Sequence, residues 1–172
     1  MTTRREVLQS MIVSIGGASM LAACKVVVRV NPSNADGLMF YSSDELALVA
    51  RVSDLIIPQT DTPGALDVNV PGFLDALMAE WADADTQREQ HSNLRQLSSQ
   101  LGQDFTTVDD VTAENRLSDF DSRAFDGRPG QYSEYRALKG LITQAYFASE
   151  EGALQEQQWV AVPGRWDPSV EI

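Results

Sequence analysis

Residues 42–65 read SSDELALVARVSDLIIPQTDTPGA, and this stretch carries both a helix start and a helix stop. Its first four residues resemble a capping box, in which the Ser42 hydroxyl and the Glu45 carboxylate accept hydrogen bonds from unpaired backbone N–H groups. Apolar residues then recur at helical spacing until Pro58, which ends the predicted helix. The apolar stripe of this helix consists of Leu48, Val49, Val52, Leu55 and Ile56.

The connection that follows this helix is long and rich in residues that favour turns. It runs from Pro58 to Val70 and contains Thr60, Pro63 and Gly64. Pro71 is suited to the first position of a new helix, because its missing N–H group would have no helical partner there. The sequence therefore predicts a rigid surface loop between two helices.

Four further apolar stripes predict four more helices. The third helix is expected to stop around Gly102, the fourth to begin after Thr107 or Thr112, and the fifth to close at Gly152. No alternating run long enough for a sheet occurs, so the predicted fold class is all-α. It is a small bundle of about five helices with an irregular N-terminal tether and C-terminal tail. The stripes are Phe73, Leu74, Leu77, Met78 and Trp81; Leu94, Leu97, Leu101 and Phe105; Leu117, Phe120, Ala124 and Phe125; and Tyr135, Leu138, Leu141, Ile142, Ala145 and Tyr146.

Length, charge and cysteine content narrow the classes of protein that fit. The chain has 172 residues, one cysteine and a formal net charge of −12. This length suits a single domain. The negative charge would repel phosphates and anionic headgroups, which excludes nucleic-acid binding. One cysteine allows neither an intrachain disulfide nor a thiolate metal cluster, so packing must stabilise the fold.

The N-terminus reads as an export signal. Arg4 and Arg5 precede an apolar run over residues 11–23, which has the length of a signal-peptide core and is too short to span a bilayer. The arginine pair resembles the twin-arginine export signal, which a receptor reads. An ordinary secretory leader that contains two arginines is the alternative. Either interpretation places the mature chain in the periplasm.

The end of this leader, Leu21-Ala22-Ala23-Cys24, resembles the lipobox of bacterial lipoproteins, in which the cysteine is lipidated. Acyl chains on Cys24 would anchor the protein, and we expect contact with a membrane only through such an anchor. The alternative is cleavage after Ala23, which leaves a free thiol. The predicted division is a signal peptide over 1–23, a tether over 24–41 and a helical domain over 42–172.

Few residues could carry chemistry. His91 is the only histidine, lies in a polar stretch and is interpreted as an exposed bystander. The aspartate pairs at 83/85 and 119/121 lack the spacing of a calcium loop, and the carboxylates are interpreted as solvated. No glycine-rich dinucleotide fingerprint or phosphate loop occurs. The sequence therefore predicts no catalytic, cofactor-binding or metal-binding residue in this chain.

The three tryptophans divide into two groups. Trp81 lies on an apolar stripe and is predicted to be in the core. Trp159 and Trp166 lie in the tail, where they either fold back on the domain or anchor a partner.

The predicted export signal and the absence of a cofactor-binding motif, taken together, suggest a role for the chain. Twin-arginine export is known for carrying proteins that are already folded, commonly around a cofactor. A chain without a cofactor motif fits this route if the cofactor belongs to a partner that is exported with it.

Two stretches resemble a known family. Residues 55–65, LIIPQTDTPGA, and 70–75, VPGFLD, resemble the "IIPxTDTPGA…VPxFID" signature of the gluconate 2-dehydrogenase small subunit family, subunit 3. Residues 146–150 and 162–167 are similar to the closing segment of that family, so the resemblance covers most of the chain from about Ser42 onward.

This resemblance implies a non-catalytic small subunit that accompanies a large FAD-dependent oxidoreductase of the glucose–methanol–choline type. Such large subunits oxidise sugars, sugar acids or polyols and pass electrons to a cytochrome c subunit or another acceptor. The small subunit supplies the export signal and stabilises its partner.

A stiff loop loses little entropy on docking, which favours the predicted loop as the partner interface. The interface candidates are Pro58, Asp61, Thr62, Pro63, Gly64, Arg165 and Trp166. The alternative for the loop is a plain helix connector. The alternative for the whole protein is a free-standing periplasmic lipoprotein that binds a ligand by itself.

Overall fold

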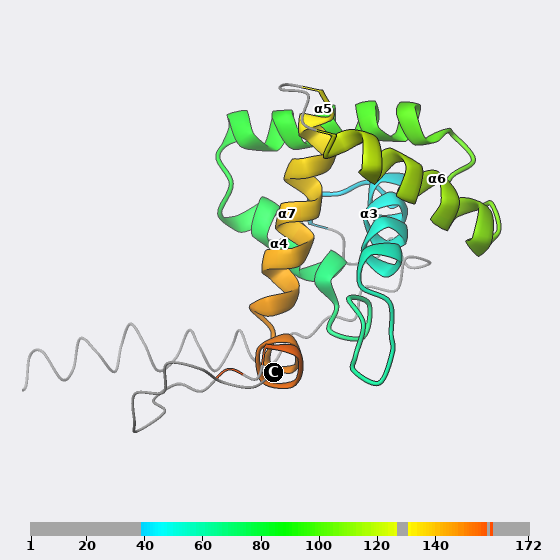
Figure 1. Ribbon diagram of the computed structural model, residues 1–172. Helices are drawn as coiled ribbons and strands as arrows, with labels where there is room; N and C mark the ends of the chain where they lie inside the picture. The colour runs from blue at the N-terminus through cyan, green and yellow to red at the C-terminus, as the bar shows by residue number, and fades with distance from the viewer. Residues whose placement is uncertain (1–38, 127–130, 158, 160–172) are drawn as a thin grey trace, which may run out of the picture.

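Six helical elements make up the described structure, a computed structural model that describes residues 39–126, 131–157 and 159 (Figure 1). No strand occurs within these residues, so the all-α prediction is confirmed. None of the helices in this part of the chain is long and apolar enough to cross a membrane. The elements are α3 (Ser43–Ile56), α4 (Val70–Glu80), α5 (Ala84–Leu101), α6 (Asp110–Ala124), α7 (Ser133–Phe147) and the π-helical turn η2 (Gly152–Glu156).

Helix α3 begins and ends where its sequence predicts. The Glu45 N–H donates to the Ser42 hydroxyl at 3.3 Å, and the Ser42 N–H donates to the Glu45 carboxylate at 3.0 Å, so the capping box is formed. The helix stops at Ile56, because the residue before Pro58 is disfavoured in the helical conformation. Its buried face includes Leu46, Leu48, Val49 and Val52, whereas Leu55 and Ile56 are half-buried.

Helix α4 is apolar on more than one side. Leu74 and Met78 are buried, but Phe73 on the outer side is 49% exposed. The prediction that Trp81 lies in the core is wrong, since its side chain is 81% exposed. Trp81 keeps helical backbone angles as the C-cap residue, so the apolar stripe continues to it, but no described residue covers this end of the stripe.

The remaining helices bury the predicted stripes with two exceptions, the half-buried Leu141 and the exposed Phe125. Asp83 and Asp109 cap α5 and α6 through side-chain oxygens that accept from Thr86 and Thr112, so α6 starts between its two predicted positions. Phe125 follows α6 and is 55% exposed, with the Lys139 ammonium 5.0 Å from its ring centroid. Gly152 does not close the regular structure, because η2 continues from it.

The helices pack around a shared core. Helix α4 packs against both α3 and α7, and α5 packs against the same two helices. In Figure 1, α3 and α7 stand upright at the centre, and α5 lies across their upper ends. The loop between α3 and α4 lies at the opposite end of the molecule from α5, as does η2 (Figure 1).

A buried carboxylate fixes the chain that leads into α3. Asp75 is only 2% exposed and accepts three backbone hydrogen bonds, from Met39 at 2.8 Å, Phe40 at 3.0 Å and Tyr41 at 2.7 Å. Glu134 is also buried and accepts from the Gln96 amide at 3.0 Å. The interpretation of the carboxylates as solvated is therefore wrong for these two, because each replaces its water shell with protein donors.

Aromatic residues complete this attachment. The Tyr41 ring is buried, which raises its pKa to about 12, and its hydroxyl accepts from the Gln90 amide at 3.1 Å. Phe40 stacks on His91 with ring centroids 4.2 Å apart, and His91 Nδ1 lies 2.8 Å from Glu45. His91 is thus not the predicted bystander: it links α5 to α3 and to the incoming chain.

Replacing Asp75 by Asn tests this attachment. One amide oxygen cannot accept three N–H donors, so Asp75→Asn should lower the free energy of unfolding by about 2–3 kcal/mol. Urea unfolding of the two proteins measures the difference. Asp83→Asn is the matched control, because Asn caps a helix about as well as Asp and this variant should unfold like the parent. Equal stability of Asp75→Asn and the parent would contradict the assigned role.

Candidate partner interface

The loop between α3 and α4 is closed by its own backbone. The Ala65 N–H donates to the Ile57 carbonyl at 2.9 Å, which brings the two ends of the predicted interface segment together. Gly64 sits inside this closure. A Cβ atom at Gly64 would lie 2.5 Å from the Gln59 nitrogen and 2.8 Å from the Pro58 carbonyl carbon. Only glycine therefore permits this close approach of backbone to backbone.

Further hydrogen bonds stiffen the loop on both sides of Gly64. The Thr60 N–H donates to the Thr62 carbonyl at 3.0 Å, and the Gly64 N–H donates to the Asp67 carboxylate at 2.8 Å. Pro58 and Asp61 are exposed at the tip, whereas Thr62 and Pro63 are half-buried. The segment is thus a braced loop, and its exposed tip is available to another molecule.

The C-terminal part of the chain packs against the loop. The Tyr146 hydroxyl at the end of α7 donates to the Pro63 carbonyl at 2.7 Å. The Thr62 hydroxyl donates to Glu156 in η2. The loop thus contacts Tyr146, which belongs to the stretch 146–150 that resembles the family, and the turn η2 that follows, so residues more than 80 positions apart form one surface. We refer to residues 58–64 together with η2 as the loop–turn surface.

The position of η2 depends on a second close approach. A Cβ atom at Gly152 would lie 2.2 Å from the Tyr146 carbonyl oxygen, so glycine lets the turn pack directly on the end of α7. The Trp159 N–H donates to the Ala153 carbonyl at 2.9 Å, and the Trp159 side chain is 57% exposed. Arg165 and Trp166 lie outside the described residues, as do Arg4, Arg5 and Cys24.

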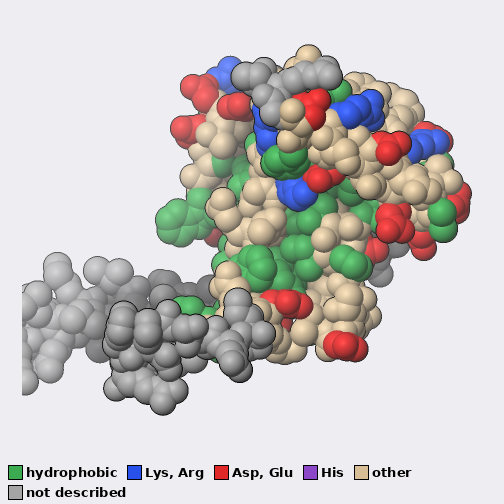
Figure 2. Space-filling model, in the orientation of Figure 1, with side chains coloured by type: hydrophobic (Ala, Val, Ile, Leu, Met, Phe, Trp, Pro, Cys, Tyr) green, Lys and Arg blue, Asp and Glu red, His purple; other side chains and the backbone are tan. Residues whose placement is uncertain are grey.

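Apolar side chains are exposed on and around the loop–turn surface. Leu66 follows the loop and is 43% exposed, and Leu154 in η2 is 51% exposed. In Figure 2 the charged side chains gather over α5 and α6, while the face below them shows a larger share of hydrophobic side chains. Exposed apolar area next to a stiff loop is typical of a surface that another protein covers.

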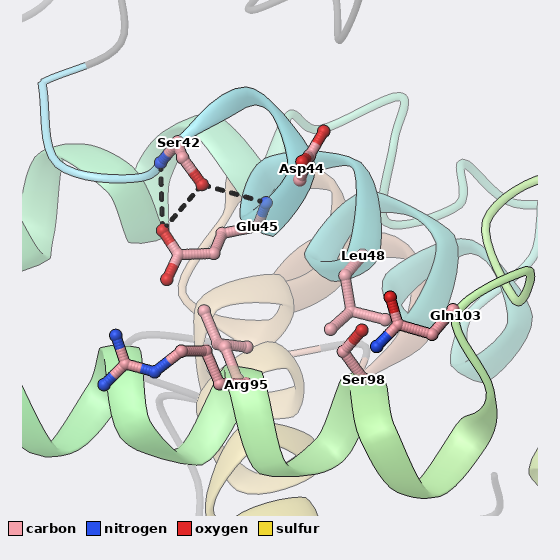
Figure 3. A pocket seen from close by; sticks show the side chains of 8 residues that line it. Ser42, Asp44, Glu45, Leu48, Arg95, Ser98 and Gln103 are labelled. Carbon is pink, nitrogen blue, oxygen red and sulfur yellow. Dashed lines mark hydrogen bonds between the residues drawn. The ribbon is translucent and has the colours of Figure 1, made fainter.

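A cleft of about 530 Å³ lies between the start of α3 and α5 (Figure 3). The side-chain types of a nucleophilic catalytic site lie near this cleft, in Ser42, Glu45 and His91. They are not hydrogen-bonded in the order that such a site requires. The Ser42 hydroxyl donates to Glu45 at 2.9 Å instead of to the imidazole. A serine is activated by a base that takes its proton. Here the Ser42 hydroxyl and Glu45 form the helix cap, and His91 is bonded to Glu45.

Glu45 and Asp121, which join neighbouring helices, have shifted pKa values with structural causes. Burial alone would raise the pKa of Glu45, but hydrogen bonds from Ser42 and His91 outweigh burial and lower it. Burial alone would also raise the pKa of Asp121, but the hydrogen bonds from Lys139 and Tyr135 outweigh burial and lower it. Asp121 joins α6 to α7 through them, at 2.5 Å and 2.7 Å. These shifts accompany packing contacts between helices.

No group of three or more metal-binding side chains occurs within the described residues. The features of the described chain define a class: a small all-α protein that presents a stiff surface loop, suited to docking on another protein. The chain belongs to the gluconate 2-dehydrogenase subunit 3 family, because the model of that family matches residues 43–164. Membership implies a small subunit of a dehydrogenase complex, with other gluconate dehydrogenase subunits as its partners. Neither the curated proteins nor the solved structures gave a match.

The family match spans both segments of the loop–turn surface and ends just before Arg165. It also spans Asp75, whose role sequence reasoning missed. The sequence does contain a signal for this role: Asp75 is the last residue of the stretch VPGFLD, and apolar residues flank it in a helix whose other acid, Glu80, is the last residue. An acid in the apolar part of a helix is costly unless it is paired, which predicts a buried partner.

Two glycine substitutions test the loop closure. Gly64→Ala should lower the free energy of unfolding by about 2 kcal/mol, because the methyl group meets backbone atoms that cannot move aside. Gly140→Ala is the matched control. Its added Cβ would meet nothing within 4 Å, so it should raise stability by about 0.5–1 kcal/mol through helix propensity. Urea unfolding measures both, and equal effects at the two sites would contradict the closure.

Proposed function

We propose that this chain is the non-catalytic small subunit of a periplasmic FAD-dependent dehydrogenase that oxidises sugars, sugar acids or polyols. FAD belongs to the large catalytic subunit, and a cytochrome c subunit is the proposed electron acceptor. The small subunit supplies the twin-arginine export signal and stabilises the catalytic subunit. Family membership supports the place of the chain in a dehydrogenase complex.

The observation that carries the docking role is the loop–turn surface. Two segments far apart in the sequence meet there through Tyr146 and Thr62. The exposed tip at Pro58 and Asp61 is held by backbone bonds within the loop, so little conformational entropy would be lost when a partner binds. We therefore place the catalytic subunit against this surface, with Arg165 and Trp166 in the adjoining tail as further contacts.

Export in complex accounts for the leader. A receptor that reads Arg4 and Arg5 would carry the folded flavoprotein out together with this chain. Lipidation of Cys24 would then hold the complex at the membrane surface. A free-standing periplasmic lipoprotein would use the same leader, so the two functions differ in whether a catalytic subunit depends on it.

Replacing Arg4 and Arg5 by Lys tests the shared export. Lysine keeps the positive charge that an ordinary secretory leader needs, but it removes the pair that the twin-arginine receptor reads. We expect dehydrogenase activity to stay in the cytoplasm of cells that carry the double variant, as measured in fractionated extracts. Activity that still reaches the periplasm would contradict export through this leader.

Charge reversal at Asp61 tests the docking surface. Asp61 is exposed at the loop tip, so Asp61→Lys should leave stability unchanged and weaken binding to the catalytic subunit by about tenfold or more. Asp119→Lys makes the same change at an exposed position of α6, away from the loop, and serves as the matched control. Affinity measured with the purified subunits should fall only for Asp61→Lys. Equal affinities of Asp61→Lys and Asp119→Lys for the catalytic subunit would show that the loop is not part of the interface.

A further inference from the structure

Three apolar side chains form an exposed face on α4. Phe73, Leu77 and Trp81 follow one another at intervals of four residues, so they lie on one side of the helix. Phe73 and Trp81 are exposed, whereas Leu77 is half-buried against the core. The Trp81 N–H donates to the Leu77 carbonyl at 3.0 Å, so the helical arrangement continues to Trp81. We refer to these three residues as the outer α4 face.

The outer α4 face differs from the other exposed apolar residues in its continuity. Val111 and Phe125 are exposed singly, at opposite ends of α6. Single apolar residues are common on protein surfaces, but contiguous ones mark sites that another molecule covers. Tryptophan is also enriched among the residues that carry most of the energy of an interface. The outer α4 face therefore indicates a binding surface.

This face begins where the loop between α3 and α4 ends. The Val70 N–H donates to the Ala65 carbonyl at 2.9 Å, so the closed loop leads directly into the first turn of α4. Three residues, roughly 5 Å of helix, separate Val70 from Phe73. The exposed Leu66 lies between the loop and this turn in the sequence. In Figure 1, α4 then runs from the loop to the left edge of the helical domain.

The outer α4 face is too small to hold a partner by itself. An aromatic side chain offers about 150–250 Å² of contact area, and Phe73 and Leu77 are partly covered. Three such side chains fall well short of the roughly 800 Å² that each partner buries in a stable interface. The face therefore belongs to a larger interface, and the loop–turn surface is the exposed surface to which the chain connects it.

Charge indicates the kind of partner. Residues 52–87, which include the loop and all of α4, contain no lysine, arginine or histidine. Glu80 and Asp83 are exposed on either side of Trp81 in the sequence, as Asp61 is at the loop tip. A second copy of the chain would bring these carboxylates against one another, because a symmetric dimer pairs the same surface on both subunits. A different protein with lysine or arginine around an apolar pocket is complementary to this face.

We propose that the outer α4 face is the second part of the surface that binds the catalytic flavoprotein subunit. Trp81 enters an apolar pocket of that subunit, and basic residues around the pocket face Glu80 and Asp83. The proposal rests on the proposed function, because it assigns this face to the same partner as the loop–turn surface. The stiff loop fixes the orientation of the partner, and Trp81 supplies much of the binding energy.

Replacing Trp81 by Ser tests the proposal. The binding partner in the test is the flavoprotein that co-purifies with the tagged parent chain. We expect Trp81→Ser to weaken binding at least about tenfold, because a tryptophan that fills a pocket dominates the energy of an interface. The urea midpoint of the variant alone should equal that of the parent, since the side chain is exposed. Phe125→Ser removes an exposed aromatic side chain next to α6 and should bind like the parent.

Replacing Glu80 by Lys tests the basic rim. We expect Glu80→Lys to weaken binding about threefold or more at low ionic strength and less at high ionic strength, because salt screens charges at the rim of an interface. Asp119→Lys makes the same reversal on α6 and is the matched control. Unchanged or tighter binding by Glu80→Lys would contradict a partner with a basic rim.

Four further results would overturn the proposal. Equal affinities of Trp81→Ser and the parent would show that the face lies outside the interface, and the proposed function would stand. A lower urea midpoint for Trp81→Ser alone would show that another part of the same chain covers the face. A dimer of the isolated parent chain that Trp81→Ser dissociates, measured by sedimentation, would assign the face to a second copy. If no flavoprotein co-purifies with the parent, the proposed function itself fails, and this inference fails with it.

Discussion

The hydrogen bond from the Ala65 N–H to the Ile57 carbonyl is the constraint on which the functional surface depends. It turns a long connection between two helices into a closed loop with one shape. The closure requires glycine at position 64, since any side chain there would meet the backbone of residues 57–59. Tyr146 and η2 pack on this closed loop. A partner that binds here would meet a preformed surface and would not need to order it.

The same loop determines where α4 starts, and α4 determines how the N-terminal segment attaches. The Val70 N–H donates to the Ala65 carbonyl at 2.9 Å, so the closed loop leads directly into the helix that carries Asp75. Asp75 in turn holds Met39, Phe40 and Tyr41. The incoming segment is thus attached only when α4 is folded. This arrangement suits the proposed role, in which a leader is presented on a folded complex.

The sequence predicts local features well and contacts between distant residues poorly. The start of α3 at Ser42 and its stop near Pro58 depend on neighbouring residues, and both were predicted. The role of Asp75 depends on the backbone of residues 39–41, and that of His91 depends on Phe40 and Glu45 from other elements. Trp81 was misplaced because periodicity shows which side of a helix is apolar and does not show how far along the helix its neighbours cover that side. The interface residues of the loop were chosen by resemblance, whereas their contact with η2 came from the structure.

Purification of the tagged chain from envelope fractions tests the central claim most directly. We expect a larger polypeptide with flavin absorbance to elute with it in a constant ratio. A single colourless protein in those fractions would contradict the proposed role as a subunit and would favour a free-standing lipoprotein.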